Sequence, residues 1–540
     1  MPASRLPLAV LNNLRHAQLS RRYALLYGKT FNRSCGSCTA PPSSVNSSSK
    51  NAALNPTTSD PPIPVADHRA LAQAQNLFIT SPYSPGSPLL QPNGAHIFQK
   101  LQSFLRAQYP QFGFQEVITP TIYKKSLWQV SGHWDEYAEH MFSVTGRGAT
   151  GQTSNAEAGQ DEEFGLKPMN CPGHCLLFDS TVRSYRDLPI RYADFSALHR
   201  NEVSGSLSGL TRVRRFHQDD AHIFCRPDQI QEEIMQTLKF VGMVYDTFNL
   251  GPYKLLLSTR PEHHFIGTIS EWETAENQLK SALNASGREW SLNAGDGAFY
   301  GPKIDIILKD STGKEHQTAT IQLDFQLPQR FNLQYQASPE ELETQETAEK
   351  DGRNKGVDEG NLRPVIIHRA IYGSLERFMA LLIEHYAGSY PFWISPRQAV
   401  ILALNQTPDV LAHVDKVQKL LSLGAPPLVD GKEVAREKTT PLSLDTIALN
   451  IDADTSARPL GKKIKEAREK GYNFIIVVGK EEVERDGVRI QAGSQDAETL
   501  FSVFSDTGSE VEVGMGGKKG LAMATGTARE GLEELVRRYL

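Results

Sequence analysis

Residues 191–225, RYADFSALHRNEVSGSLSGLTRVRRFHQDDAHIFC, constrain the fold of this chain more than any other stretch. A Gly/Ser-rich loop at 204–209 lies between two runs of alternating apolar and polar residues, so the stretch predicts two strands joined by a loop. Every second side chain of a strand shares a face, and the second strand should therefore present Arg212, Arg214, Phe216, Gln218, Asp220 and His222 together. This face predicts one wall of a site, with cations for phosphates, a ring for stacking and polar groups for a small polar ligand.

The first strand should place Leu198, Arg200 and Glu202 on one face in the same way. A charged hairpin that is merely exposed to water is the alternative interpretation. However, Arg200-Asn-Glu202, a loop, and then Arg212 and Phe216 are similar to motif 2 of the class II aminoacyl-tRNA synthetases. The longer string RxRxFxQDDAHIFC resembles the threonyl members of that class in particular.

Three further stretches carry the same resemblance. A helix expected at 96–108 leads into a β-rich run at 112–120, which resembles motif 1 and implies a homodimer. The string KPMNCPGH at 167–174 resembles the zinc-ligand loop of threonyl enzymes, although a lone cysteine before Pro-Gly is more often a buried structural thiol. At 364–377 a buried strand leads through a glycine turn into a helix, where Arg377 resembles the arginine of motif 3.

The remaining patterns indicate an α+β fold. Residues 253–260, 304–308 and 316–325 predict successive strands, which favours a largely antiparallel sheet. There is no GxxxxGK[ST] loop, so a nucleotide would be held by arginines and metal. From residue 393 strands and helices alternate, which is typical of an α/β domain with a mostly parallel sheet. The resemblance therefore implies a class II synthetase antiparallel-sheet catalytic domain followed by an α/β anticodon-binding domain.

Composition divides the chain into three parts. Residues 1–59 contain no Asp or Glu and several arginines, which is typical of a transit peptide, with a disordered basic tail as the alternative. A mitochondrial transit peptide is favoured over a plastid one, so we expect import into the mitochondrial matrix. No apolar run could span a bilayer, so we expect no membrane partner. The expected parts are a transit peptide with linker at 1–65, an aminoacylation domain at 66–394 with disordered polar insertions at 145–163 and 336–362, and an anticodon-binding domain at 395–540.

The resemblance implies a threonine–tRNA ligase, which forms threonyl-adenylate from threonine and ATP and then charges mitochondrial tRNA(Thr). Attack on the α-phosphate needs positioning and charge neutralisation more than covalent help. Arg200, Arg212 and Arg377 would be catalytic, with Mg²⁺ accompanying the ATP phosphates. Phe216 would stack on adenine and Glu202 would accept from the adenine amine. The residues implied to bind ATP are Arg200, Glu202, Arg212, Phe216, Gln317, Thr320, Gln322, Ser374 and Arg377.

Recognition of threonine is implied to depend on one zinc ion per chain. Cys171, His222 and His368 match the zinc-ligand positions of the resembled family, although a lone histidine is more often a core residue. Three protein ligands leave positions open for substrate, as in catalytic zinc sites, and threonine's amino and hydroxyl groups would occupy them. The residues implied to bind threonine are Met169, Arg200, Gln218, Asp220 and Tyr300.

Two alternatives stay open. A synthetase for another amino acid, such as proline or serine, would share the class II motifs, but prolyl enzymes of this subclass do not present the zinc triad. A catalytically inactive paralogue that serves as an RNA-binding subunit would have lost the motif arginines, which this chain retains. The bacterial members of the resembled family carry extra N-terminal domains, including an editing domain, and we expect these to be absent here.

Overall fold

The structure is a computed structural model, and it describes residues 66–145, 163–263, 265–348, 356–425, 428–429, 432–433, 441–493, 503–504, 510–513 and 519–540. The chain divides into two compact units, Met1–Ala66 and Asp67–Leu540. The transit peptide expected at 1–65, and nearly all of the insertion expected at 145–163, lie outside the described residues. Among the helices that are described, none combines the length and the apolar composition needed to cross a bilayer.

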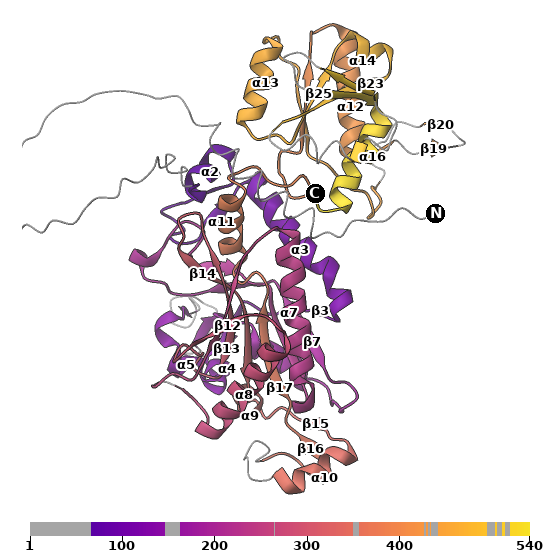
Figure 1. The fold of residues 1–540 in the computed structure, drawn as a ribbon. Coiled ribbons are helices and arrows are strands. Elements are labelled where there is room, and N and C mark those ends of the chain that lie inside the picture. Colours follow the sequence, from indigo (N-terminus) through magenta and orange to yellow (C-terminus); the bar gives the residue numbers. More distant parts are fainter. Residues whose placement is uncertain are drawn as a thin grey trace, which may run out of the picture. The chain divides into compact units, whose positions relative to one another are not determined.

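Within the described residues, the largest sheet has eight strands in the order β12-β11-β13-β14-β17-β10-β7-β3 (Figure 1). Neighbouring strands are antiparallel, except β11 with β12 and β3 with β7. This confirms the expected antiparallel catalytic sheet. The strands are β3 (Gln115–Glu116), β7 (Ile190–Asp194), β10 (Asp220–Cys225), β11 (Lys254–Ser258), β12 (Trp290–Asn293), β13 (Lys303–Lys309), β14 (Glu315–Asp324) and β17 (Val365–Ala370).

Four helices share a hydrophobic core with this sheet: α3 (Pro92–Phe112), α7 (Ile230–Thr247), α8 (Ile269–Ala285) and α11 (Leu375–His385). Three of them begin at a local sequence signal. Pro92 is the first residue of α3, Thr268 and Glu271 form a capping box at α8, and the Ser374 side chain accepts from a backbone N–H in the first turn of α11. These caps determine where the helices start, and burial of their apolar faces holds them on the sheet.

Residues 191–225 form four short strands rather than the two expected. β7 and β10 belong to the large sheet, whereas β8 (Ala197–His199) pairs with β9 (Arg215–His217) in a separate sheet. The expectation that Arg212 and Arg214 lie on a strand is wrong. Ser208 and Arg212 instead exchange backbone hydrogen bonds around a tight turn, in which Gly209 has a φ of 49°. The alternation is broken again after His217, where β9 ends, and β10 begins three residues later at Asp220.

The insertion expected at 336–362 is ordered at both ends. β15 (Tyr335–Gln336) pairs with β16 (Asn361–Leu362), and α10 (Pro339–Ala348) follows β15. The Ser338 side chain accepts from the Glu341 backbone N–H, and the Glu341 carboxylate accepts from the backbone N–H of Ser338. Expecting disorder here was therefore wrong for the described residues, because this capping box and the ladder satisfy backbone groups that composition alone does not reveal.

A second sheet lies in the C-terminal part of the chain, in the order β21-β18-β22-β23-β25-β24. β18 is parallel to β21 and β22, but the other three of the five pairs are antiparallel, so the expectation of a mostly parallel sheet is wrong. A parallel crossover needs a dozen or more residues, and only a short connection with the helix α14 joins β22 to β23. The elements are β18 (Ala399–Ala403), β21 (Ile451–Asp454), β22 (Phe474–Val478), β23 (Gly487–Ala492), β24 (Glu510–Val513), β25 (Lys519–Ala524), α12 (Pro408–Leu423), α13 (Leu460–Glu469), α14 (Lys480–Glu484) and α16 (Thr525–Arg537).

Shorter elements complete the described fold. A three-stranded sheet, β4-β6-β5, precedes the helix α6, which carries Cys171. These elements are α2 (His68–Gln75), β1 (Phe78–Ile79), β2 (Leu89–Leu90), β4 (Ile122–Lys124), α4 (Lys125–Ser131), α5 (His133–Glu136), β5 (Ser143–Val144), β6 (Phe164–Leu166), α6 (Cys171–Asp179), α9 (Gln326–Arg330), β19 (Leu428–Val429) and β20 (Lys432–Glu433).

Candidate active site

Three metal-ligating side chains from distant parts of the sequence meet on the large sheet. His222 on β10 and His368 on β17 are direct partners across an antiparallel ladder, and their ring centroids are 4.6 Å apart. Cys171 is the first residue of α6. The ligand atoms of the three residues all lie within 4.8 Å of one another, and all three side chains are buried. The fold therefore brings together the three residues that the sequence could only suggest one at a time.

The residues around this cluster fit a metal ion. Nε2 of His368 lies 2.9 Å from a carboxylate oxygen of Asp324, and Nδ1 of His222 lies 2.7 Å from Nδ1 of His174. One nitrogen of each imidazole is thus oriented by a neighbour, and the other is left for a metal, as is usual for metal-ligating histidines. One thiolate with two imidazoles is a donor set suited to zinc.

Burial governs the protonation of these ligands. It raises the pKa of the Cys171 thiol well above its usual range, and the nearby Asp220 carboxylate raises it further. It also lowers the pKa of His222, with His368 adding to the effect, so that this imidazole is neutral. A divalent cation would stabilise the Cys171 thiolate and bind neutral imidazoles, since both effects follow from its charge.

Polar side chains adjoin the cluster on the side of β10. Asp220 Oδ1 lies 3.9 Å from His222 Nε2, and the Asp220 side chain is almost fully buried. The Tyr300 ring lies 5.0 Å from the ring of His368, and its hydroxyl donates to the side chain of Gln322. A carboxylate and an oriented phenol beside the Cys/His cluster can recognise the amino and hydroxyl groups of a small ligand.

Met169 and Gln218 are also close to this region. The Met169 sulfur lies 3.2 Å from Nε2 of His133, which is itself 4.0 Å from the Cys171 sulfur. Gln218 forms an isolated β-bridge with Ser374, the residue that caps α11. The structure thus places Met169 beside the Cys/His cluster. It places Gln218 at the start of α11, the helix that carries Arg377.

The three arginines of the motifs form a second group. Burial lowers the pKa of Arg377, and the positive charges of Arg200 and Arg212 lower it further. The Arg377 guanidinium donates to the backbone oxygens of Thr211 and Gln317, at 3.0 and 2.9 Å. Mutual repulsion among three cations is relieved by an anion, so this group predicts a binding site for phosphates.

The other two arginines are held differently. Arg212 is about half exposed and pairs with Glu202 at 2.7 Å. The Arg200 guanidinium lies 5.0 Å from the centre of the Phe216 ring and donates to the backbone oxygen of Pro168. Phe216 is buried, so Arg200 covers part of the ring that was expected to stack on adenine. Any adenine stacked on Phe216 therefore uses the ring face that Arg200 leaves free.

A β-bulge explains why three polar residues of β14 lie together. Asp305 pairs with Thr320 and Ile307 with Gln317, so β14 has one extra residue here. The bulge turns Gln317 to the face of Thr320, and both side chains donate to the Asp305 carboxylate. Gln322 follows two residues later on the same face. The three residues that the resemblance assigns to the ATP site thus share one face of the sheet.

Sequence reasoning missed four residues that support the site. His174 and Asp324 orient the two histidines of the cluster. His133 is fully buried, and this burial lowers its pKa to about 3, with a smaller contribution from the charge of His368. Asp219 accepts from three successive backbone N–H groups in the turn before α11. Only His174 had a signal in the sequence, because it follows Cys171 by one helical turn.

Comparison with known proteins agrees with this geometry. The model for the tRNA synthetase class II core domain (G, H, P, S and T) matches residues 155–348, and the model for the anticodon binding domain matches residues 398–499.

Three individual proteins illustrate the similarity. The probable mitochondrial threonine–tRNA ligase of Schizosaccharomyces pombe is 50% identical over 421 residues, which cover 78% of this chain and 83% of that protein. The mitochondrial threonine–tRNA ligase of Saccharomyces cerevisiae is 47% identical over 425 residues, which cover 77% of this chain and 84% of that protein. A crystal structure of the RNA binding domain of threonyl-tRNA synthetase from Cryptosporidium parvum Iowa II has a TM-score of 0.68 and 39% identity, and the match covers 87% of this chain and 98% of that one.

Proposed function

Because the chain belongs to the threonine–tRNA ligases, which are class II aminoacyl-tRNA synthetases, we propose that the arginine group and the Cys/His cluster are the two halves of its active site. The protein activates threonine with ATP and transfers it to tRNA. Its location is mitochondrial, as it is for the two fungal relatives. The matrix, and mitochondrial tRNA(Thr) as the acceptor, are the finer assignments that we propose.

The arginines bind ATP and neutralise the charge that develops during attack on the α-phosphate. Arg200 holds the α-phosphate and the carboxylate of threonine, while Arg212 and Arg377 hold the γ-phosphate end. Mg²⁺ bound with ATP would add positive charge that neutralises the phosphates. Phe216 stacks on adenine, and Glu202 accepts from its amine. The shared face of β14 and the capping residue Ser374 complete the nucleotide site. The observation in support is that burial and the neighbouring Arg200 and Arg212 lower the pKa of Arg377 despite the opposing charge of Glu202, so a further anion would be stabilising here.

Threonine binds at the Cys/His cluster. Cys171, His222 and His368 would hold one zinc ion, which supplies Lewis-acid positions for the amino and hydroxyl groups of threonine. Asp220 accepts from the threonine hydroxyl. Gln218 and Tyr300 orient the amino acid, with Met169 at the side of the site. The convergence of three buried ligands to within 4.8 Å carries this assignment.

The division of the chain supports tRNA binding at its C-terminal part. We propose an aminoacylation domain at 66–394 and an anticodon-binding domain at 395–540, preceded by a transit peptide and linker at 1–65. The second sheet and its helices begin at β18, and the anticodon-domain match begins at residue 398. Charging would then join recognition of tRNA in the second domain to chemistry in the first.

A homodimer is the assembly that best accounts for one exposed apolar group. Gly173 of α6 lies close to the side chains of Thr119 and Tyr123, so the segments around these residues are neighbours. These segments expose four large apolar side chains, and exposed apolar side chains that gather on one face can mark a protein–protein interface. These side chains are Ile118, Ile122, Leu176 and Val182. Sedimentation should give a dimer for the wild type and a monomer for Ile118→Asp, and a monomeric wild type would contradict the proposal.

Amino-acid-dependent ATP–pyrophosphate exchange tests the function. Exchange should be strong with threonine and at most weak with the other nineteen amino acids, and it should be lost in Arg377→Ala. Exchange driven by proline would favour a synthetase for another amino acid. Absence of exchange in a folded protein that still binds tRNA would favour an inactive paralogue.

A further inference from the structure

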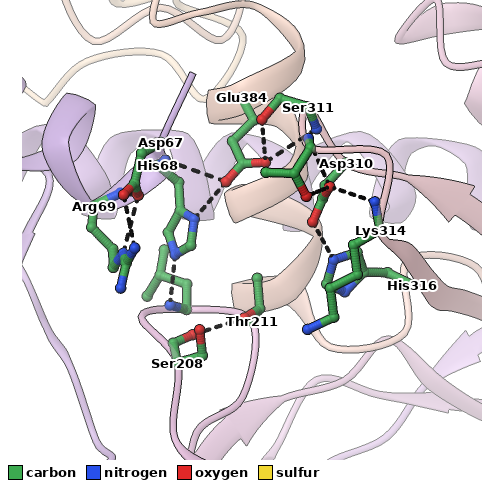
Figure 2. Close-up of polar contacts among 12 residues, drawn as sticks. Asp67, His68, Arg69, Ser208, Thr211, Asp310, Ser311, Lys314, His316 and Glu384 are labelled. Atoms are coloured by element: carbon green, nitrogen blue, oxygen red, sulfur yellow. Dashed lines mark hydrogen bonds and ion pairs between the residues drawn. The ribbon is translucent and has the colours of Figure 1, made fainter. Parts of the chain in front are cut away.

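A buried histidine away from the Cys/His cluster connects two segments of the proposed ATP site. His68 is the first residue of α2 and is 5% exposed. Its Nδ1 lies 2.7 Å from a carboxylate oxygen of Glu384 on α11, and its Nε2 lies 3.2 Å from the backbone nitrogen of Leu210. Figure 2 shows the His68 ring between Glu384 and the turn that carries Ser208 and Thr211. The ring thus joins α11 to the turn at 208–212, from which Arg212 extends.

These hydrogen bonds specify where the His68 proton lies. A backbone N–H only donates, so Nε2 must accept from Leu210 and is unprotonated. Nδ1 then carries the proton and donates to Glu384. The other oxygen of that carboxylate accepts from the hydroxyl and the backbone N–H of Ser311, at 3.1 and 3.4 Å. The Glu384 carboxylate is therefore held by His68 on one side and by Ser311 on the other. Rotation of the His68 ring would break the hydrogen bonds of the ring to Glu384 and to Leu210.

The turn fits closely against His68. Gly209 has a φ of 49°, and a Cβ atom added to it would lie 2.2 Å from Nε2 of His68, so only glycine allows this approach. On the far side of the turn, Arg377 donates to the backbone oxygen of Thr211 at 3.0 Å. Two successive residues of the turn, Leu210 and Thr211, are thus bound by side chains that belong to α11 or are anchored on it.

A cation site is the competing interpretation of these groups, since Asp67, His68 and Glu384 place ligand atoms within 4.8 Å of one another. However, the Asp67 carboxylate is bound by two guanidinium nitrogens of Arg69, at 3.1 and 2.8 Å. Both nitrogens of His68 are also engaged. A cation would have to displace all of these hydrogen bonds, so the geometry favours a connection between segments.

We propose that His68 is a positioning residue for adenylation, which fixes the turn at 208–212 to α11 so that Arg212 and Arg377 face the same ATP phosphates. This rests on the assignment of those two arginines to ATP in the proposed function. Arg377 and Glu384 are seven residues apart, about two helical turns, and so lie on the same side of α11. The Arg212 guanidinium is half exposed and paired with Glu202, so the backbone of the turn and this ion pair together limit its position.

The experiment compares the full chain with His68→Leu, which removes both hydrogen bonds, and with His68→Gln, which can accept from Leu210 and donate to Glu384. His316→Leu is a matched control, because His316 is also buried and also pairs with a carboxylate, Asp310, at 2.7 Å, but does not reach the turn. Two quantities are measured for each. These are the KM values for ATP and threonine in pyrophosphate exchange, and the hydrogen-exchange rate of the Leu210 amide.

His68→Leu should raise the KM for ATP roughly three- to tenfold, the effect of one or two lost hydrogen bonds, with the KM for threonine within about twofold of wild type. The Leu210 amide should also exchange faster in His68→Leu. His68→Gln should restore much of the KM for ATP and of the Leu210 exchange rate. His316→Leu should change neither the KM for ATP nor that exchange rate. A folded His68→Leu protein with an unchanged KM for ATP, or an equal rise in both KM values, would overturn the proposal.

Hydrogen exchange in the wild type tests the connection without any variant. If the Leu210 amide exchanges as fast as those of the exposed residues Ser204 and Gly205, the connection does not form and the proposal fails, even if His68→Leu does not fold. A wild type that shows no threonine-dependent exchange activity, but has a protected Leu210 amide, would instead contradict the proposed function.

Discussion

Replacement of Asp324 by asparagine should weaken zinc binding without removing a ligand. One Asp324 oxygen accepts from two backbone N–H groups, and the other lies 2.9 Å from Nε2 of His368. The carboxylate therefore requires a proton on Nε2 and leaves Nδ1 free to bind the metal. In Asp324→Asn, the side-chain amide would face Nε2 with its own hydrogens, and the tautomer that avoids this conflict carries its proton on Nδ1, where it blocks the metal.

The size of the effect follows from that one interaction. A hydrogen bond to a charged group contributes about 1.5–3 kcal/mol, which corresponds to roughly 10- to 150-fold in affinity. Replacement of residues that orient metal ligands typically costs about 10- to 100-fold in metal affinity, in agreement. Competition against a chromophoric zinc chelator measures this loss directly and does not depend on catalysis.

Asp305→Asn is the matched control. Asp305 is also a buried aspartate of the large sheet, but it contacts Ser258 and Lys303 rather than the cluster. The zinc affinity of the Asp305→Asn protein should stay within about twofold of that of the wild type. Equal zinc affinities for Asp324→Asn and wild type, or equal losses in Asp324→Asn and Asp305→Asn, would refute this reasoning.

Three further outcomes are expected. Serine keeps both metal-binding groups and lacks one methyl, so pyrophosphate exchange should discriminate against it only about 10- to 200-fold. Valine lacks the hydroxyl that Asp220 accepts from, so it should be rejected on the order of 10⁴-fold. Equal rejection of serine and valine would contradict the assigned roles. Deletion of residues 146–162, whose composition cannot bury enough apolar area to offset ordering, should leave adenylation within a few-fold of wild type, and a collapse of activity would show that they contribute to the site. Burial alone would raise the pKa of Asp194, but the neighbouring His174, the hydrogen bonds from Ser196 and Thr119, and the charge of Lys167 lower it overall. Its contribution to stability is therefore present above the unfolded pKa of about 4 and is lost as pH falls toward the lower folded pKa. Urea unfolding between pH 3 and pH 6 should therefore show a shallower loss of stability for Asp194→Asn than for wild type, and parallel curves would argue against this role.

Local patterns predicted the main elements of the catalytic part well. The strands at 304–308 and 316–325 were expected from alternation and are present as β13, which is one residue longer at each end, and β14, which is shifted by one residue toward the N-terminus. The structure departs from these expectations where backbone hydrogen bonds outweigh the local alternation of apolar and polar residues. The turn at 208–212 replaces an expected strand because backbone hydrogen bonds close it around Gly209.

The metal cluster was implied by resemblance, and its geometry depends on pairings that no local pattern encodes. His222 and His368 become neighbours only through the register of β10 with β17. The residues that orient the site are separated from their partners by 44 positions for Asp324, 48 for His174 and 316 for His68. An isolated histidine or aspartate in a sequence carries no record of such a partner, so these residues could be found only from the structure.

Zinc K-edge X-ray absorption of the purified protein tests the central claim most directly, because it reports the atoms bound to the metal. The assignment predicts about one zinc per chain, with one sulfur at about 2.3 Å and two imidazole nitrogens at about 2.0 Å, and loss of the sulfur shell in Cys171→Ser. Addition of threonine should change the remaining light-atom shell while the sulfur and imidazole shells persist. A metal-free protein that activates threonine fully, or a zinc spectrum without sulfur, would contradict the account.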